Sequence, residues 1–398
     1  MTDYNFDQVV ARRGTGSAKW AQYEEDVLPM WVADMDFQVA PAITEALQAR
    51  VSHGIFGYTM PPEALKQAIV GRLADAYAWQ VQPEEIVFIP GVIPGINMAA
   101  RATAQDGAVM IQPPVYHPFH SIHEWSGTGH QEAPLVYTET DDGFTYSIDF
   151  EALEAAMTPE TRMFLLCQPH NPVGRVWTRD ELAQLVAICE RHDVAICSDE
   201  IHCDLILGDV PHTPTATLSE AAAARTITLM APSKTFNVPG LGFSFAVIQD
   251  AALRQQFVEA GMGIVTAQMG GQTMSFINMM GHTAATAAYQ DGWDWLGAAL
   301  DYMRANRDYA QAYIAEHMPQ IKTATLEGTY LLWLDCRALD LPSPPGAWFL
   351  AQAQVALNEG GMFGEEGAGF VRMNLATPRA LLERGLERMC DALQTVQG

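Results

Sequence analysis

Short apolar segments alternate with amphipathic ones through the middle of this chain, and this alternation restricts its possible folds more than any other feature. The segments "EIVFIPG", "AVMIQPP", "RMFLLCQ", "VAICSDE" and "TITLMAPS" are typical of buried strands, and "INMAARATA" and "TRDELAQLVAICERH" of helices. Strands that are apolar throughout belong to parallel sheets with helices on both faces. The alternation therefore predicts an α/β fold, a three-layer α/β/α domain around a mainly parallel sheet.

The segment after Thr178 illustrates the helical pattern. Leu182, Leu185, Val186 and Cys189 recur at the spacing of one helix face. Thr178 stands just before them, where its hydroxyl can accept a hydrogen bond from the first turn. We expect a helix that begins directly after Thr178.

The pattern changes after about residue 285. Long helical stretches follow, of which "WDWLGAALDYMRANRDYAQAYIAEHM" is the clearest, together with "TYLLWLDC" and "GFVRMNL", which are typical of strands. At 398 residues the chain is long enough for two or three domains of about 150 residues each. We expect an N-terminal arm over residues 1–45 that contributes to the small domain, a large domain over 46–284 and a smaller α+β domain over 285–398.

The charge balance restricts the possible partners. There are 22 basic and 47 acidic residues, giving a formal net charge of -25. Such a surface repels phosphate backbones and anionic lipid, so nucleic acid and membranes are poor partners. No apolar run approaches the ~20 residues that cross a bilayer, and "MTDYNFDQVV" does not resemble a signal peptide. We expect a soluble, cytoplasmic protein that acts on a small molecule.

The six cysteines lie mostly inside apolar stretches and form no CxxC pair. We therefore expect buried, reduced thiols rather than disulfides, and no metal site. They are Cys167, Cys189, Cys197, Cys203, Cys336 and Cys390.

Polar residues follow three of the expected strands, at the carboxyl ends where open α/β sheets bind ligands. They are Asn171 after "RMFLLCQ", Asp199 and His202 after "VAIC", and Ser233 and Lys234 after "TITLMA". Each has a structural alternative, because Asn-Pro forms turns, an aspartate can cap a strand end and a lysine can extend its ammonium to water. The carboxyl ends of parallel strands meet at one edge, so we expect these side chains to lie together.

A glycine-containing turn stands at the same edge. In "PGVIPGI", Gly91 and Gly95 lie where a strand passes into a helix. Such a turn offers free backbone N–H groups and the positive end of a helix dipole, which bind phosphate.

An amide, a carboxylate, a lysine and a phosphate cradle are the set that pyridoxal phosphate requires. Lys234 stands in apolar surroundings, "MAPSKTFNVPGLG", so we expect it to be at least partly buried. Burial favours the neutral amine, which can react with the aldehyde of the cofactor. A carboxylate keeps the pyridine nitrogen protonated, so that the ring accepts electrons.

Several motifs resemble those of one large family. "CQPHNPVGRVWTRDEL", "SDEIHCDL" and "APSKTFNVPGL" are similar to segments of the fold-type I pyridoxal-phosphate enzymes, the aminotransferase class I/II superfamily. "PMWVADMDF", "GIFGYT", "EGTYLLWLD" and "GFVRMNLATPR" resemble its MalY/PatB-type carbon–sulfur β-lyases, for which cystathionine β-lyase activity is typical. The resemblance covers nearly the whole chain.

The resemblance implies a role for ten residues of this chain. Lys234 would bind the cofactor covalently and act as the catalytic base, and Arg372 would bind the α-carboxylate of the substrate. The remaining cofactor contacts would be Asp199 at the pyridine nitrogen, Asn171 at the phenolate oxygen, Tyr116 against the ring, Val92, Ile93 and Ser233 at the phosphate, His202 in the same pocket, and Tyr58, which would reach the phosphate from the neighbouring subunit of a homodimer. Tyr58 and Asn171 would also contact the substrate. Two structural alternatives stay open. Tyr116 packs against neighbouring side chains without contacting the cofactor, or Arg372 pairs with a local carboxylate instead of the substrate.

Two positions depart from ordinary aminotransferases. His202 stands three residues after Asp199, where those enzymes usually carry a tyrosine, and Gly242 stands eight residues after Lys234, where many carry an arginine for the phosphate. The lyase subgroup is similar in lacking that arginine. We therefore expect backbone N–H groups, hydroxyls and Tyr58 to bind the phosphate.

The resemblance implies α,β-elimination from L-cystathionine or another L-cysteine S-conjugate, giving a thiol, pyruvate and ammonia. An aminotransferase that uses a 2-oxo acid acceptor would share the first steps and is the main alternative. A regulatory protein that uses the same fold to bind a transcription factor is a further alternative, against which the complete set of site residues argues. A nicotinamide enzyme is disfavoured because "PGVIPGIN" is not GxGxxG.

Overall fold

Seven strands form the central sheet of the computed structural model, in which residues 4–269 and 272–397 are described. All neighbouring strands run parallel except β10, which is antiparallel to both its neighbours. The mainly parallel sheet expected from the sequence is confirmed. The order across the sheet is β2 (Ile86–Ile89), β10 (Ser244–Val247), β9 (Thr226–Met230), β8 (Ala195–Asp199), β7 (Thr161–Cys167), β3 (Ala108–Ile111) and β4 (Gly129–Glu132).

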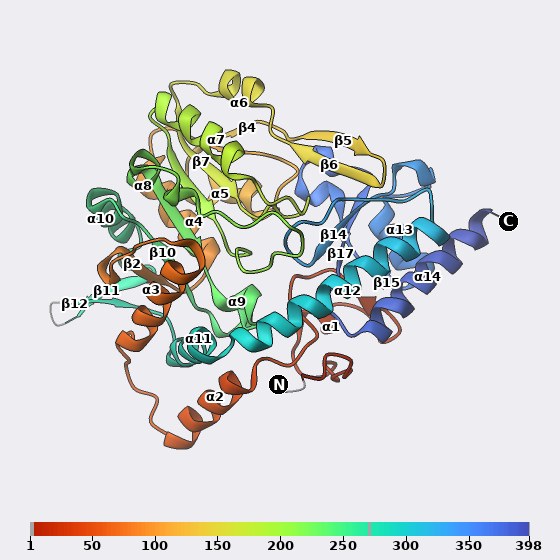
Figure 1. Cartoon of the computed structure of the whole chain (residues 1–398), viewed down its shortest axis with the longest axis horizontal. Helices are drawn as coiled ribbons and strands as arrows, with labels where there is room; N and C mark the ends of the chain where they lie inside the picture. Colours follow the sequence, from red (N-terminus) through yellow and green to blue (C-terminus); the bar gives the residue numbers. More distant parts are fainter. Residues whose placement is uncertain (1–3, 270–271, 398) are drawn as a thin grey trace.

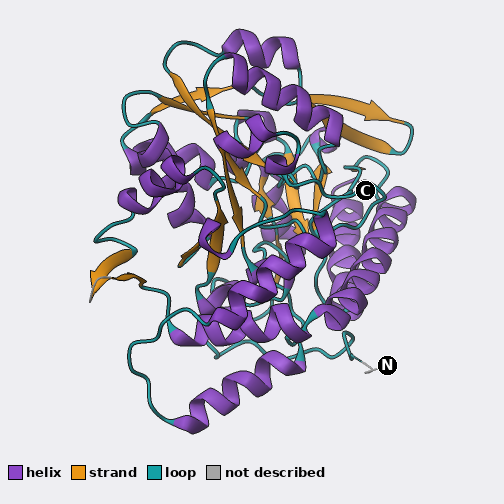
Figure 2. Ribbon diagram, turned by 60° about the vertical axis from the view of Figure 1, so that its left-hand side comes forward, coloured by secondary structure: helices purple, strands orange, loops and turns teal. Residues whose placement is uncertain are grey.

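Both faces of the sheet are buried. In β7, Met163 and Leu165 belong to one apolar cluster and Phe164 and Leu166 to another, because successive side chains point to opposite faces. Helices cover both faces, as Figure 2 shows. The helices on the face of Met163 are α4 (Val92–Thr103), α5 (Pro118–Ser126) and α10 (Ala251–Ala260). The helices on the other face are α6 (Phe150–Ala156), α7 (Arg179–Arg191) and α8 (Glu220–Arg225). Two more helices, α3 (Glu63–Tyr77) and α11 (Met279–Asp291), pack near β2 and β10.

The helix after Thr178 begins as expected. The Thr178 hydroxyl accepts from the Glu181 N–H at 3.2 Å, and the Glu181 carboxylate accepts from the Thr178 N–H at 2.8 Å. These reciprocal bonds satisfy two N–H groups that a helix start otherwise leaves free. Leu182 and Leu185 are buried below them.

A smaller antiparallel sheet is formed by the C-terminal part of the chain. Three helices pack beside it, and α12 lies along α14 (Figure 1). The strands are β13 (Lys322–Thr323), β14 (Leu331–Asp335), β17 (Phe370–Asn374) and β16 (Asn358–Glu359), and the helices are α12 (Trp293–His317), α13 (Pro345–Ala353) and α14 (Arg379–Gln397).

The N-terminal segment packs against this C-terminal part. It contains α1 (Ala18–Ala21), β1 (Leu28–Pro29) and α2 (Pro41–His53), and β1 pairs in parallel with β15 (Val355–Ala356). One apolar cluster includes Phe6, Phe236, Trp295 and Leu386, so it joins all three expected parts of the chain. The division at residues 45 and 284 stays a prediction.

The remaining elements are short. The hairpins are β5 (Val136–Thr140) with β6 (Gly143–Ser147), and β11 (Thr266–Met269) with β12 (Gln272–Ser275), and α9 (Pro232–Thr235) follows β9. All six cysteines are free and buried, as expected. Among the described residues, no helix combines the length and the apolar character that a bilayer span requires.

Candidate active site

A cavity of about 330 Å³ lies at the carboxyl ends of β7, β8 and β9. It brings together nine of the ten residues to which the family resemblance assigns a role. They are Asn171, Asp199, His202, Ser233, Lys234, Tyr116, Val92, Ile93 and Arg372.

Asp199, the last residue of β8, is a buried carboxyl group that forms no ion pair with a described residue. One of its oxygens accepts from the Ile201 N–H at 3.2 Å, and no basic nitrogen of the described residues lies within ion-pair distance. Burial raises the pKa of Asp199 to about 7, against the opposing effects of the Ile201 N–H and the charge of Lys234. A cation placed in the cavity would be the partner that this carboxylate lacks.

Lys234 lies on α9 and is partly buried, as expected. Its Nζ donates to the Ala33 carbonyl at 2.7 Å and forms no ion pair with a described residue. Burial, and secondly the charge of Arg372, lower the pKa of Lys234 to about 8, with Asp34 and Asp199 opposing. Roughly a tenth of this amine is therefore neutral at pH 7, far more than for an ordinary lysine, and a neutral amine is a nucleophile and a base.

Arg372, on β17, is a buried guanidinium without an anionic partner among the described residues. It donates to Asn171 Oδ1 at 2.7 Å, to Asn358 Oδ1 at 2.6 Å and to the Trp31 carbonyl at 3.1 Å, while its Nε has no partner. The ring of Phe363 lies 4.9 Å from its central carbon. Burial lowers the pKa of Arg372 to about 10. No described carboxylate forms an ion pair with Arg372, so the alternative that Arg372 pairs with a local carboxylate is wrong for the described residues.

The start of α4 lines the cavity with backbone N–H groups. Val92 and Ile93 are its first two residues, and no side chain caps this end. The N–H groups of a first helical turn have no partner within the helix and attract anions.

The two glycines of the turn differ in role. Gly91 precedes the helix, but Gly95 lies inside it and donates its N–H to the Gly91 carbonyl at 3.2 Å. A Cβ at Gly95 would stand 2.5 Å from the side chain of Ile89. The expectation that Gly95 helps to present free N–H groups is therefore wrong: it permits close packing of the helix on the sheet. Gly242 lines the cavity with a φ of +60°, which favours glycine.

Tyr116 and His202 both line the cavity. Tyr116 lines the cavity and also packs against Phe119, with ring centroids 6.3 Å apart, so both interpretations of this residue stay open. His202 is buried, and its Nδ1 has no hydrogen-bond partner. Burial, with the charges of Lys234 and Arg372, lowers the pKa of His202 well below its usual value, so the ring is neutral.

Tyr58 does not reach this cavity within one chain. Its side chain is 90% exposed, in a segment after α2 that lines a second cavity with Phe56 and Met279. The expectation placed Tyr58 at the site of a neighbouring subunit, and that arrangement stays a prediction.

The lining residues that reasoning from the sequence missed include Trp31, Ala33 and Asn358. The motif "PMWVADMDF" contains the first two, but only as part of the family resemblance. Asn358 stands on the short strand β16, in no motif. The feature that could have identified Asn358 as a site residue is the pairing of β16 with β17, because this pairing sets Asn358 opposite Arg372.

Polar bonds from distant segments hold the loop around Ala33. Asn374 donates to the carbonyls of Val32 and Asp34, both at 2.7 Å, and Arg12 forms an ion pair with Asp34 at 2.6 Å. The carbonyl that accepts from the lysine is thus fixed from both termini of the chain.

Comparison with known proteins agrees with this geometry. The family model "Aminotransferase class I and II" matches residues 25–389. Cystathionine beta-lyase PatB of Bacillus subtilis is 40% identical, covering 98% of this chain and 100% of the relative, and Protein MalY of Escherichia coli is 33% identical, covering 99% and 100%. The crystal structure of cystalysin from Treponema denticola, which contains pyridoxal 5'-phosphate, superimposes with a TM-score of 0.91 at 33% identity, covering 99% and 100%.

These matches extend over almost the whole chain, and the resemblance drawn from its motifs is confirmed at the level of the family. The chain belongs to the class I and II aminotransferase family.

Proposed function

We propose that this protein is a pyridoxal-phosphate-dependent carbon–sulfur β-lyase that cleaves L-cystathionine or another L-cysteine S-conjugate. The observation that carries the proposal is the cavity itself. It contains an unpaired buried carboxyl, Asp199, an amine of lowered pKa, Lys234, and an unpaired buried guanidinium, Arg372. The relatives named cystathionine beta-lyase support the choice of reaction.

The chemical character of the lining residues fits the cofactor. When bound, pyridoxal phosphate supplies an aldehyde for a lysine and a ring that accepts electrons. Asp199 would be the anionic partner of the protonated pyridine nitrogen, and the N–H groups of Val92 and Ile93, with Ser233, would bind the phosphate. Asn171, Tyr116 and His202 would complete the contacts of the ring.

Two residues of the chain would act on the substrate. Arg372 would bind its α-carboxylate through two guanidinium N–H groups, which fixes the orientation of Cα. The Nζ of Lys234 would then remove the Cα proton, for which a pKa of about 8 is suitable near neutral pH. The sulfur leaves as a thiolate, and addition of water to the remaining three-carbon unit gives pyruvate and ammonia.

The proposal includes a homodimer in the cytoplasm. Ile55, Phe56 and Tyr58 are exposed by 65%, 61% and 90% in the single chain, and burial of such a segment in an interface is favourable. In the dimer, Tyr58 of the partner subunit would bind the phosphate and contact the substrate.

Product analysis tests the reaction. We expect the purified holoenzyme to release pyruvate and thiol from L-cystathionine in equal amounts, with no 2-oxo acid present. S-substituted cysteines with good thiolate leaving groups should react as well. A strict requirement for 2-oxoglutarate would reject the lyase in favour of an aminotransferase, and the absence of bound cofactor would favour a binding protein.

The pKa of Lys234 predicts how cofactor uptake depends on pH. Only the neutral amine reacts with the aldehyde, so covalent attachment to the apoenzyme should accelerate by about tenfold per pH unit below pH 8. The rate should level off above about pH 8, because the pKa of Lys234 is lowered to about 8. Stopped-flow absorbance on mixing apoenzyme with pyridoxal phosphate measures this rate. A rate that still rises tenfold per unit at pH 9 would indicate an ordinary lysine.

A further inference from the structure

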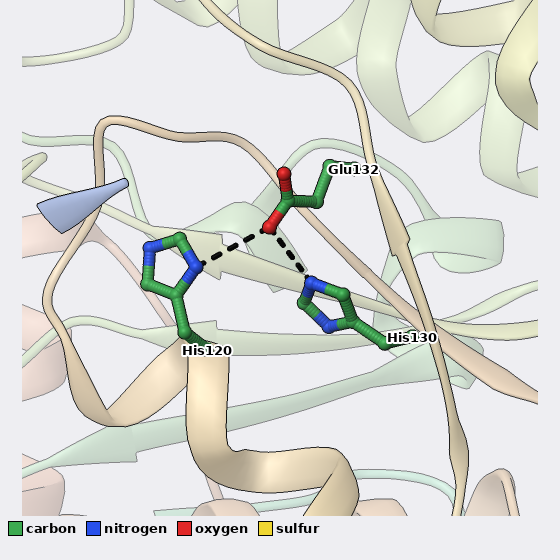
Figure 3. A group of neighbouring side chains, drawn as sticks. All are labelled: His120, His130 and Glu132. Carbon is green, nitrogen blue, oxygen red and sulfur yellow. Dashed lines mark hydrogen bonds and ion pairs between the residues drawn. The ribbon is translucent and has the colours of Figure 1, made fainter. Parts of the chain in front are cut away.

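Two histidines and a glutamate converge at the edge of the central sheet, outside the active-site cavity. Figure 3 shows His120, on α5, beside His130 and Glu132, on the edge strand β4. His120 Nδ1 lies 3.3 Å and His130 Nε2 2.7 Å from the same oxygen, Glu132 Oε1. The three potential ligand atoms all lie within 4.8 Å of one another. His130 and Glu132 share a face of β4 because they are two residues apart.

The hydrogen bond of His120 determines which of its nitrogens can act as a ligand. Its Nε2 lies 3.0 Å from the Phe363 carbonyl, which can only accept, so Nε2 carries a hydrogen. The Nδ1 of the neutral ring then directs a lone pair at the Glu132 carboxylate. A cation between or beside His120 Nδ1 and this carboxylate oxygen, which lie 3.3 Å apart, would stabilise the arrangement, and it can be a proton or a metal ion.

A backbone carbonyl bound to the second nitrogen is also the usual support of a metal-binding histidine, because it fixes the tautomer and the ring orientation. His130 is held from one side by His123, whose ring centroid lies 4.8 Å away. His120 and His130 are both partly buried, which limits their rotation.

We propose that His120, His130 and Glu132 bind a divalent first-row transition metal ion, for which Zn²⁺ is the best match. Imidazole nitrogens with one carboxylate suit zinc, whereas magnesium and calcium prefer oxygen ligands. In a tetrahedral zinc site, neighbouring ligand atoms stand about 3.4 Å apart. The distance between His120 and Glu132 is 3.3 Å, and the 2.7 Å hydrogen bond between His130 and Glu132 would lengthen on metal binding. The Glu132 side chain is 38% exposed, so it can adjust and a water can complete the shell.

The site would join α5 to β4 next to the active-site cavity. His120 also holds the carbonyl of Phe363, whose ring packs against Arg372. A metal ion bound at this site would therefore restrain His120, Phe363 and Arg372 from outside the cavity. The proposal does not depend on which reaction the protein catalyses. It also departs from the expectation of no metal site, which considered the cysteines and not these histidines.

Zinc titration of the metal-stripped holoenzyme tests the proposal. We expect competition with a chromogenic zinc indicator to show one Zn²⁺ per chain, and the melting temperature to rise on zinc addition. His130→Gln and Glu132→Gln should each weaken zinc binding by at least about tenfold and abolish the rise in melting temperature.

The matched control is His192→Gln. His192 stands 3.3 Å from Glu154 as a surface His–Glu pair, outside the cluster, so this variant should bind zinc like the natural chain. No zinc binding, or the same affinity in all variants, would overturn the proposal and leave a proton as the cation at His120. If His130→Gln does not fold, the exposed Glu132→Gln decides the question alone.

Discussion

Replacing Lys234 by alanine should lower kcat for pyruvate release by at least about 10⁴-fold. The variant loses the amine that binds the cofactor covalently and the base that removes the Cα proton, and general base catalysis alone contributes about 10²- to 10⁴-fold. The remaining contacts around the cavity should still bind cofactor non-covalently. Steady-state kinetics with L-cystathionine and the absorbance of bound cofactor measure the two effects separately.

The control for this prediction is Lys322→Ala. Lys322 forms a surface ion pair with Glu139 at 2.8 Å, and its loss should leave kcat within about twofold. Circular dichroism of both variants checks that the fold is retained. If Lys234→Ala keeps activity within tenfold of the natural chain, another residue is the base.

Replacing Arg372 by alanine should raise KM for L-cystathionine by roughly 10²- to 10³-fold, with a smaller effect on kcat. A bidentate, charge-assisted pair with a carboxylate contributes about 3–4 kcal/mol, and each 1.4 kcal/mol corresponds to a factor of ten. Arg372→Lys keeps the charge but loses the bidentate geometry, so its KM should fall between that of the natural chain and that of Arg372→Ala. Kinetics with a substrate that lacks the α-carboxylate provide a second measurement, because Arg372→Ala should hardly alter its KM.

Arg337→Ala is the control for Arg372. Both guanidinium groups lie over aromatic rings, at 4.7 Å from Phe370 for Arg337 and 4.9 Å from Phe363 for Arg372, but Arg337 pairs with Asp335 outside the cavity. Its removal should leave KM unchanged. An unchanged KM in Arg372→Ala would instead exclude that residue from carboxylate binding. Some loss of stability is expected in Arg372→Ala, because Asn171 and Asn358 lose a buried donor.

Most of the sheet and the centre of the candidate site could be predicted from local patterns. The strands around Asp199 and Asn171 are continuous apolar runs, and their carboxyl ends meet because the strands are parallel. Lys234 was expected to be partly buried because its sequence neighbours are apolar. These predictions needed only short-range information.

The rest depends on contacts between distant segments. The antiparallel direction of β10 follows from its pairing with β2 and β9, which hydropathy does not encode. Ala33 and Asn358 reach the cavity through long-range bonds of their loops. His120 and His130 carry no recognisable spacing, and only the packing of α5 beside β4 brings them together. Tyr58 depends on a second chain, which no pattern within one chain can place.

Reduction of the holoenzyme with borohydride, followed by peptide mass spectrometry, identifies the lysine that carries the cofactor. The chain has only four lysines, Lys19, Lys66, Lys234 and Lys322, so the attachment point can be assigned without ambiguity. We expect one pyridoxyl-phosphate adduct per chain, on the peptide that contains Lys234. An adduct on any of the other three lysines, or none in a protein that turns over substrate, would contradict this expectation.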